Sequence, residues 1–288
     1  MMKNKMDVCL IGLGRMGAPM AATLAAKGFA VRAWTRTERP DMRRDARITL
    51  LPTAEAAVAG ADAVILMLSD GNATEELLFG RKLAQAIGKE AIVIDMATIG
   101  PNAARDHAAR LAKLGLRYID APVSGGVKGA EAGTLTIFAG GGREDFAAAT
   151  PFLAALGTPH HLGPVGAGQT AKLANQIMVA IYIGAVAEGL HFAEAQGLDA
   201  SALVGALQGG FADSAILRQH GAKMAARSFA PGGTCRLHLK DLDLAFDLIA
   251  PEQPRLHLGE AIRERFRALV AAGQSEADHS AYFLTYGA

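Results

Sequence analysis

The sequence predicts a mostly parallel, doubly wound α/β domain, followed by a long linking helix and an all-α C-terminal domain. Short apolar runs alternate with helical segments through the first half of the chain, which is typical of a parallel sheet covered by helices on both faces. A long apolar stretch, AGQTAKLANQIMVAIYIGAVAEG, then runs from Ala167 to Gly189. From Leu190 onward the strand-like runs stop and helical patterns continue alone. We therefore place the α/β domain at 1–164, the linking helix at 165–193 and the helical domain at 194–288.

Composition and charge narrow the class of protein. A chain of 288 residues is long for one compact core, which favours two domains. The net charge of +1 gives no field that attracts nucleic acid or a membrane surface. Cys9 and Cys235 are too few for the disulfide framework of a secreted domain, and Cys9 is expected to be a buried free thiol. No signal-peptide pattern is present, and the apolar run over 173–187 is short and flanked by polar groups. We expect a cytoplasmic protein without nucleic-acid or membrane partners.

The N-terminal segment carries a dinucleotide-binding pattern. An apolar run over 7–11 predicts a strand, a helix is expected over 18–27 with Gly28 as its C-cap, and 29–34 predicts a second strand. Between strand and helix lies a GxGxxG motif, the fingerprint of a Rossmann fold. Its glycines allow a tight turn, backbone approach to a pyrophosphate and close helix packing, while the helix N-terminus attracts the phosphates. The predicted cofactor-binding residues here are Gly12, Leu13, Gly14, Arg15, Met16 and Gly17.

The end of the second strand decides between the two nicotinamide cofactors. An NAD site usually has an acidic residue there to bond the ribose 2′-hydroxyl. This chain has Thr35, Arg36 and Thr37, with no acid until Glu38. A guanidinium matches a 2′-phosphate, and the threonine hydroxyls add hydrogen bonds. We therefore predict that NADP(H) is preferred over NAD(H). The arginines that follow, up to Arg47, are interpreted as a solvated face.

Further strands are predicted over 63–68, 91–95, 116–120 and 135–139, with a helix over 102–114. Ligands of such sheets bind beyond the carboxyl ends of the strands. That rule selects Met67, Leu68 and Thr98 as cofactor-binding candidates and 121–126 as a further cleft segment. Ser69 to Asn72 is expected to be a turn or a helix cap.

Two segments have the chemistry of a substrate site. In Ser124-Gly125-Gly126, backbone N–H groups and a hydroxyl can face one anion, such as a carboxylate, although a plain glycine turn has the same pattern. Lys172 is a single cation early in the long apolar helix. From the residues alone it is either a lysine at a solvated edge or a buried lysine whose pKa is lowered for acid–base work. Asn175 and Gln176 follow near the same helical face and could bond the reacting oxygen or a carboxylate.

Several strings, in order along the chain, resemble those of the β-hydroxyacid dehydrogenase family. They are GLGRMG at 12–17, DAPVSGG at 120–126, AEAGTL at 130–135, GAGQTAKLANQ at 166–176 and KDLDLA at 240–245. The resemblance implies a Rossmann domain, a linking helix and a helical domain that builds homodimers or homotetramers. It also implies NAD(P)-dependent interconversion of a small 3-hydroxy acid with its semialdehyde or keto acid.

The resemblance also implies roles for residues. The loop over 124–126 would hold the carboxylate of a small substrate, and Lys172 would be the general acid and base. Lys240 would approach the nicotinamide and Asp241 would face the substrate; without the resemblance, these two would read as a surface ion pair. In the second half, helices are expected over 199–208, 214–227, 238–249 and 258–271. The eight histidines show no metal-ligand spacing, so no metal site is predicted.

Two departures from the family pattern bear on the substrate. Many members have Asn four residues after the catalytic lysine, whereas this chain has Gln176 there and Asn175 before it; some members that act on tartronate semialdehyde share this order. Many members also have an aromatic residue where this chain has Gly233, which indicates a larger or different substrate, or a pocket completed by another side chain. An imine reductase and a non-catalytic NADP-binding module are the alternatives, although imine reductases generally replace the lysine.

Overall fold

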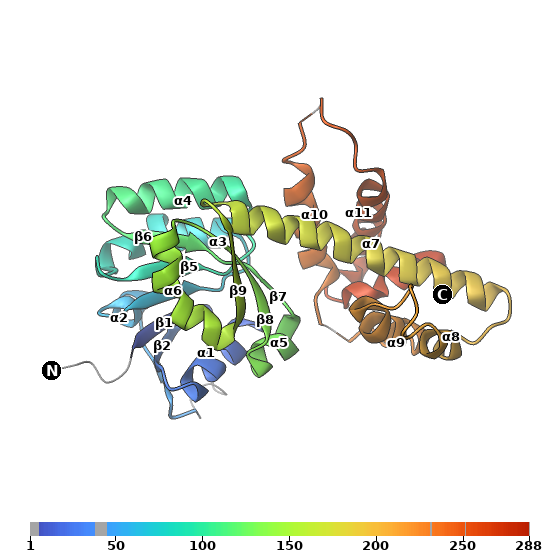
Figure 1. The fold of residues 1–288 in the computed structure, drawn as a ribbon, viewed down its shortest axis with the longest axis horizontal. Coiled ribbons are helices and arrows are strands. Elements are labelled where there is room, and N and C mark those ends of the chain that lie inside the picture. Colours follow the sequence, from blue (N-terminus) through green and yellow to red (C-terminus); the bar gives the residue numbers. More distant parts are fainter. Residues whose placement is uncertain (1–5, 38–44, 231, 251, 288) are drawn as a thin grey trace. The chain divides into compact units, whose positions relative to one another are not determined.

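The computed structural model describes residues 6–37, 45–230, 232–250 and 252–287. The chain divides into two compact units, Met1–Lys172 and Leu173–Ala288. Each unit is described by itself below. Figure 1 shows the sheet of the first unit and the helices of the second.

The first unit is built on a nine-stranded sheet with the order β3-β2-β1-β4-β5-β6-β8-β7, with β9 paired to β8. The β1–β6 strands are parallel, β8 is antiparallel to β6 and β7, and β9 is parallel to β8. The mostly parallel sheet predicted from the sequence is confirmed. The strands are β1 (Asp7–Ile11), β2 (Ala30–Trp34), β3 (Ile48–Leu50), β4 (Ala63–Leu66), β5 (Ile92–Asp95), β6 (Arg117–Asp120), β7 (Val123–Ser124), β8 (Leu135–Gly140) and β9 (Gly157–Gly163).

Helices cover both faces of this sheet, and each face has its own cluster of buried apolar side chains. One face packs against α1 (Gly17–Ala26), α5 (Gly126–Ala132) and α6 (Arg143–Leu156). The other packs against α2 (Ala54–Val58), the turns η2 (Glu76–Gly80) and η3 (Leu83–Ala86), and α4 (Pro101–Lys113), while α3 (Gly71–Glu75) leads into η2.

The alternation of side chains along β1 explains why its sequence is apolar from Val8 to Ile11. Val8 and Leu10 belong to the first cluster, whereas Cys9 and Ile11 belong to the second. A strand buried on both faces needs apolar residues at every position. All four side chains are fully buried, so β1 is the centre of the hydrophobic core of this unit.

The second unit is helical, as predicted. Its described residues contain no strand, only an isolated bridge between Thr234 and Asp278. One apolar core, centred on Phe266, Tyr282 and Phe283, joins its helices. The elements are α7 (Ala167–Ala195), whose first residues belong to the first unit, α8 (Ala200–Ala206), η4 (Leu217–Gly221), α9 (Ala222–Ala225), α10 (Cys235–Phe246), α11 (His257–Leu269), η5 (Val270–Gln274) and η6 (His279–Tyr286).

By length and composition, α7 is the one described helix that could cross a membrane, with a hydropathy of 1.4 in its most apolar window. A third of that window, 33%, is buried inside the protein. Long helices in the cores of soluble proteins meet the same criterion, so this property does not identify a membrane span.

Each unit holds one cysteine, and both thiols are free and buried. The prediction for Cys9 is confirmed. Burial raises the pKa of Cys9 to about 12, and burial together with the nearby Asp278 carboxylate raises the pKa of Cys235 to about 12.

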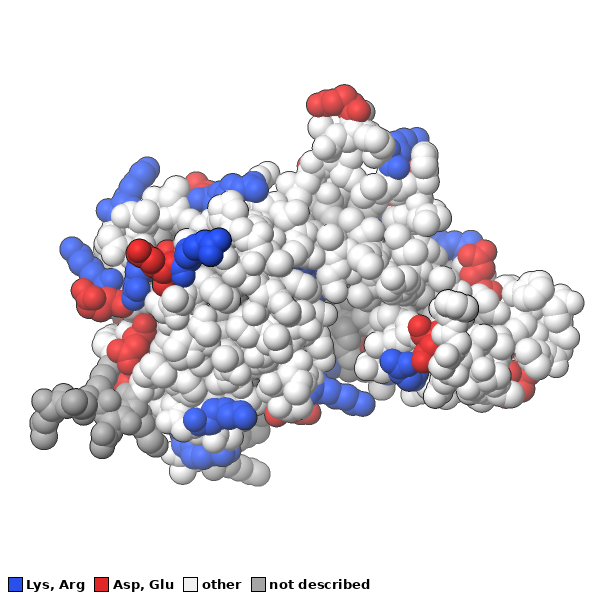
Figure 2. All heavy atoms as spheres, viewed as in Figure 1, with Lys and Arg blue, Asp and Glu red and all other residues white. Residues whose placement is uncertain are grey.

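Charges are mixed on the surface. On the face drawn in Figure 2, the described acidic and basic side chains are scattered among neutral ones, with no broad field of one sign. This agrees with the net charge of +1. The described residues on this face therefore form no basic stripe of the kind that binds nucleic acid.

Candidate functional site

The glycine turn after β1 has the three features expected of a pyrophosphate-binding loop. Gly12 has a φ of +97°, and a Cβ there would lie 2.5 Å from the carbonyl oxygen of Met67. A Cβ on Gly17 would lie 1.9 Å from the carbonyl oxygen of Gly12, so α1 starts too close to the strand for any side chain. Gly14, in contrast, is exposed and has open space where a Cβ would be. No side chain caps the N-terminus of α1, so this turn fits a dinucleotide phosphate.

Neighbouring strand ends converge on this turn. The N–H of Gly12 donates to the carbonyl oxygen of Trp34 at 2.9 Å, so Thr35 to Thr37 start beside the turn. The N–H of Met67 donates to the carbonyl oxygen of Ile11 at 2.9 Å. Arg36 and Thr37 are exposed. Within this arginine-rich stretch, Glu38, Arg39, Arg43 and Arg44 lie outside the described residues, whereas Arg47 is exposed and pairs with Asp45 at 2.8 Å.

The loop that carries Thr98 is fixed by a buried glutamine on α7. The Oε1 of Gln169 accepts hydrogen bonds from the N–H groups of Ile99 at 2.9 Å and Gly100 at 3.1 Å. Its Nε2 donates to the carbonyl oxygen of Ala97 at 2.9 Å. The Gln169 side chain is fully buried. One side chain thus holds both ends of the turn that presents Thr98.

The start of α7 is anchored to β6 by a buried carboxylate. Asp120 accepts hydrogen bonds from the N–H of Gly166 at 2.7 Å and from the N–H of Gln169 at 2.8 Å. Burial raises the pKa of Asp120 to about 6, although these backbone donors oppose the rise. The packing here is close, since a Cβ on Gly168 would lie 2.2 Å from the carbonyl oxygen of Phe138.

Lys172 lies one turn beyond Gln169 in the same helix and is 8% exposed. The side chain is therefore buried and does not lie at a solvated edge. Its position follows from the anchors described above. Asp120 and Gln169 both hold the first turn of α7, Asp120 against β6 and Gln169 against the Thr98 loop.

The predicted anion loop lies at the end of β7. Gly125 and Gly126 have φ values of +126° and +63° and are exposed. Ser124 is half-buried and pairs with Thr136 of β8. The N-terminus of α5, which starts at Gly126, has no side-chain cap, so the loop has backbone N–H groups to offer an anion.

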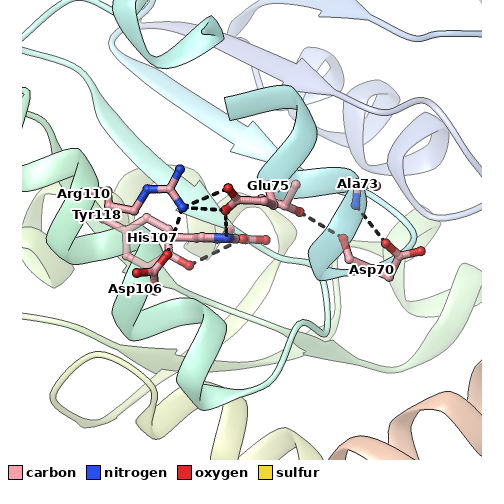
Figure 3. Close-up of polar contacts among 9 residues, drawn as sticks. Asp70, Ala73, Glu75, Asp106, His107, Arg110 and Tyr118 are labelled. Atoms are coloured by element: carbon pink, nitrogen blue, oxygen red, sulfur yellow. Dashed lines mark hydrogen bonds and ion pairs between the residues drawn. The ribbon is translucent and has the colours of Figure 1, made fainter. Parts of the chain in front are cut away.

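A charged cluster fixes the helices that follow β4 and β5 (Figure 3). Arg110 of α4 donates to both carboxylate oxygens of Glu75 at 2.9 Å and to Asp106 at 3.0 Å. His107 is buried and its Nε2 faces Glu75 at 3.2 Å; burial lowers its pKa. At the other end of α3, Asp70 accepts the N–H of Ala73 at 2.8 Å, which confirms the predicted cap.

Within the second unit, the polar residues of α7 and α10 meet. The Nε2 of Gln176 donates to Asp241 Oδ2 at 2.8 Å, and the Nδ2 of Asn175 donates to Gln176 Oε1 at 3.0 Å. The ammonium of Lys240 lies 3.0 Å from Asp241 Oδ1. Asp241 is buried, whereas the Lys240 side chain is 26% exposed, so the pair is partly buried. Four residues predicted from separate motifs are thus brought together.

The position that departs from the family pattern is filled from elsewhere in the chain. Gly233 lies against the ring of His279, whose Cε1 would be 3.2 Å from a Cβ at that position. His279 also approaches His220 and His238. The ligand atoms of His220, Asp278 and His279 lie within 4.8 Å of one another. Their spacing along the sequence, from separate elements, gave no sign of this cluster.

Comparisons with known proteins agree with this geometry. Residues 7–180 match the family described as the NAD-binding domain of 6-phosphogluconate dehydrogenase, and residues 166–286 match the NAD-binding domain of NADP-dependent 3-hydroxyisobutyrate dehydrogenase. The chain is 39% identical to 2-hydroxy-3-oxopropionate reductase of Escherichia coli over 278 residues, covering 96% of this chain and 95% of that protein. The chain belongs to the β-hydroxyacid dehydrogenase family.

Other members support the assignment. The 3-hydroxyisobutyrate dehydrogenase of Pseudomonas aeruginosa is 35% identical over 290 residues, covering 95% of this chain and 94% of that protein. The solved structure of Mycobacterium tuberculosis 3-hydroxyisobutyrate dehydrogenase with L-serine superposes with a TM-score of 0.86 at 32% identity, covering 99% of this chain and all of that one. As a β-hydroxyacid dehydrogenase, the protein is an NAD(P)-binding oxidoreductase that acts on hydroxy acids.

Sequence reasoning about this β-hydroxyacid dehydrogenase missed two positioning residues. Asp120 and Gln169 both lie in the strings that carry the family resemblance, but no role was predicted for them. The available signal was weak: a glutamine three residues before Lys172, on the same helical face, near a predicted loop.

Proposed function

We propose that this enzyme interconverts a small 3-hydroxy acid and its semialdehyde or keto acid with NADP(H), with Lys172 as the general acid and base. The observation that carries the proposal is the burial of Lys172 in the turn of α7 that Gln169 fixes beside the Thr98 loop. A buried lysine held on a rigid helix is suited to proton transfer, because the helix fixes the position of the ammonium group.

A nicotinamide cofactor held by the glycine turn at 12–17 would supply a hydride for the reduction of the carbonyl carbon, and would take up a hydride in the oxidative direction. Lys172 donates a proton to the carbonyl oxygen during reduction and takes the hydroxyl proton during oxidation. The backbone N–H groups and the serine hydroxyl of 124–126 bind the substrate carboxylate. Asn175, Gln176 and Asp241 bind the other polar groups of the substrate, and Lys240 approaches the nicotinamide of the cofactor.

The substrate that we propose is 2-hydroxy-3-oxopropanoate, also known as tartronate semialdehyde. The support is the 39% identity to the E. coli reductase of that name and the adjacent Asn175 and Gln176, whose amides bond each other and Asp241. Two amides and a carboxylate are more polar than a pocket for a methyl-bearing hydroxy acid requires, and they suit a substrate with an extra hydroxyl.

For the cofactor, the support is the exposed Arg36 beside the glycine turn, in place of an acidic residue. We further propose a cytoplasmic enzyme that forms a homodimer or homotetramer through its C-terminal helices. The domain boundaries at 164 and 193 belong to the same proposal.

The test of Lys172 separates chemistry from binding. We expect Lys172→Ala to lower kcat for NADPH-dependent reduction of tartronate semialdehyde by about 10²- to 10⁴-fold, the size of a lost general acid. The affinity for NADPH, measured by cofactor fluorescence, should stay within about 3-fold of wild type, because the substitution leaves the residues that bind the cofactor unchanged. Lys113→Ala, at an exposed lysine, is the matched control. Unchanged turnover in Lys172→Ala would contradict the assignment.

The cofactor proposal has its own test. Arg36→Gln should raise the KM for NADPH by about 10-fold or more while leaving the KM for NADH unchanged, because a charged hydrogen bond to the 2′-phosphate is lost. Equal catalytic efficiency of the wild-type enzyme with the two cofactors would refute the role of Arg36.

One observation keeps an imine reductase as a second candidate, namely Gly233, where the family pattern has an aromatic residue. A panel of aldehyde acids, keto acids and cyclic imines, followed by NADPH oxidation, decides between them. Turnover of cyclic imines without turnover of any carbonyl acid would favour the second candidate, and binding of NADPH without any turnover would favour a non-catalytic module.

A further inference from the structure

A threonine hydroxyl joins the helix of the dinucleotide turn to the helix of the anion loop. Thr23 lies in α1, which follows the glycine turn at 12–17 and packs beside α5 (Figure 1). Its Oγ1 donates to the carbonyl oxygen of Ala130 at 2.7 Å and to that of Glu131 at 3.3 Å, both in α5. Thr23 is 8% exposed. A threonine inside a helix commonly bonds a carbonyl of its own preceding turn, whereas these two bonds reach a second helix.

The helix that receives these bonds is short. α5 has seven residues, Gly126–Ala132, and a helix of about two turns has little stability of its own. Its last carbonyl oxygens need donors from outside the helix. The N–H of Thr134 donates to the carbonyl oxygen of Gly129 at 2.9 Å, and the Thr23 hydroxyl serves the next two carbonyls. The C-terminal end of α5 is thus fixed to α1.

The string AEAGTL at 130–135, which the proposed reaction leaves without a role, closes this contact. Gly133 has a φ of +65°, and a Cβ there would lie 3.3 Å from the methyl group of Thr23. The Leu135 side chain is fully buried, and its Cδ2 would lie 3.3 Å from a Cβ on Gly125. The string therefore packs against Thr23 at one end of α5 and against the anion loop at the other.

We propose that Thr23 is a positioning residue, which fixes the anion loop at 124–126 relative to α1 and its dinucleotide turn. The inference rests on the proposed role of that loop in binding the substrate carboxylate. The backbone N–H groups at 125 and 126 lie at the N-terminus of α5, so their position follows that of the helix. Hydride transfer needs substrate and cofactor in one geometry, and groups on two helices keep one geometry only when the helices are joined.

Of the two helices, α1 is the fixed partner. Met20, Ala21 and Leu24 of α1 are fully buried in the apolar cluster on this face of the sheet. Loss of the Thr23 hydroxyl should therefore displace α5 and leave α1 and its glycine turn in place. Lys172 is held by the separate anchors described above, so the proton-transfer group should also stay in place. The expected defect is in binding of the carboxylate.

Thr23→Val removes the hydroxyl and keeps the methyl group and the shape of the side chain. We expect the KM for tartronate semialdehyde to rise about 10-fold, the effect of weakening one hydrogen bond to a charged group. Both kcat and the affinity for NADPH, measured by cofactor fluorescence, should stay within about 3-fold of wild type. Thr23→Ser keeps the donor and should restore KM. Thr150→Val is the matched control, because Thr150 donates to the carbonyl oxygen of Phe146 at 2.7 Å within α6 alone.

Hydrogen exchange follows the position of α5 without any substrate. In Thr23→Val, the amides over 126–134 should exchange about 10-fold faster or more, because the buried carbonyl of Ala130 loses its donor and the short helix opens more often. The amides over 18–27 in α1 should exchange as in wild type. Peptide-level mass spectrometry of the full-length protein measures both segments in one experiment.

A Thr23→Val variant with wild-type exchange in α5 would overturn the proposal. A loss confined to kcat, with KM unchanged, would also overturn it, because such a loss reports fewer folded molecules and no change in the position of the loop.

Ser124→Ala separates this failure from failure of the proposed function. A raised KM in Ser124→Ala, beside an unchanged KM in Thr23→Val, would refute the role of Thr23 and leave the carboxylate loop standing. If the wild-type enzyme turns over no carbonyl acid, the proposed substrate class fails, and the exchange of α5 then decides on Thr23 alone.

Discussion

Removal of the Gln169 side-chain hydrogen bonds should destabilise the first unit more than most single substitutions do. Methionine has nearly the same shape as glutamine but neither donor nor acceptor of comparable strength, so Gln169→Met leaves the N–H groups of Ile99 and Gly100 and the carbonyl of Ala97 without partners. Each buried backbone group without a partner costs about 1–3 kcal/mol. Since the turn relaxes partly around the new side chain, we expect a loss of about 3–5 kcal/mol in the free energy of unfolding.

The single tryptophan makes this measurable. Trp34 lies in β2 of the first unit, so its fluorescence during urea unfolding follows that unit, while circular dichroism follows both. Gln85→Met, at an exposed glutamine of the same unit, is the control and should change stability by less than about 0.5 kcal/mol. A Gln169→Met variant within about 1 kcal/mol of wild type would refute the argument that this side chain fixes the Thr98 loop.

Three further outcomes are expected. Gly14→Ala should fold normally, because its Cβ meets open space, yet it should weaken NADPH binding by about 10-fold or more by crowding the phosphates. Gly17→Ala should impair both folding and NADPH binding. Normal NADPH binding by Gly17→Ala would contradict the close packing of α1 against the glycine turn. The pKa of Asp120, raised to about 6, means that the folded protein binds a proton more tightly than the unfolded chain. The stability of the first unit should therefore fall by about 2 kcal/mol from pH 4 to 6.5, and this slope should be absent when Asp120→Asn is unfolded in urea. Asp278→Asn should lower the stability of the second unit at neutral pH by about 3 kcal/mol. The difference from wild type should shrink in acid, because the pKa of Asp278 is lowered in the folded protein and its stabilising contribution is lost as the pH falls. A difference that stays constant with pH would contradict this role of the Asp278 carboxylate.

Much of the fold could be predicted because the first unit buries its strands on both faces. The apolar runs that predicted β1, β4 and β5 match them to within about two residues, the usual uncertainty of boundaries. The elements that were missed are short or atypical. β3 has three residues and β7 has two, which is too short for any periodicity, and α6 contains Pro151, which argues against a helix in the sequence.

The site was predictable where a residue type is required locally and unpredictable where distant elements meet. The glycines at 12, 14 and 17 are required by the turn itself, so the motif alone finds them. The contacts of His279 with His238 and His220, in contrast, join residues 41 and 59 positions apart, and nothing local in the sequence signals such contacts. The contact between His279 and Gly233 is of the same kind: a glycine at 233 is meaningful only once the ring beside it is known.

The two buried thiols give each unit an internal reporter of its own opening. A thiol reagent reacts with the thiolate of an accessible cysteine, and neither Cys9 nor Cys235 meets that requirement while its unit is closed. The rate at which each cysteine is labelled therefore measures how often its own core opens, without any introduced probe. Mass spectrometry of the labelled peptides would give two opening free energies from one experiment. A change in one rate alone, on binding of NADPH or of substrate, would identify the unit that the ligand stabilises.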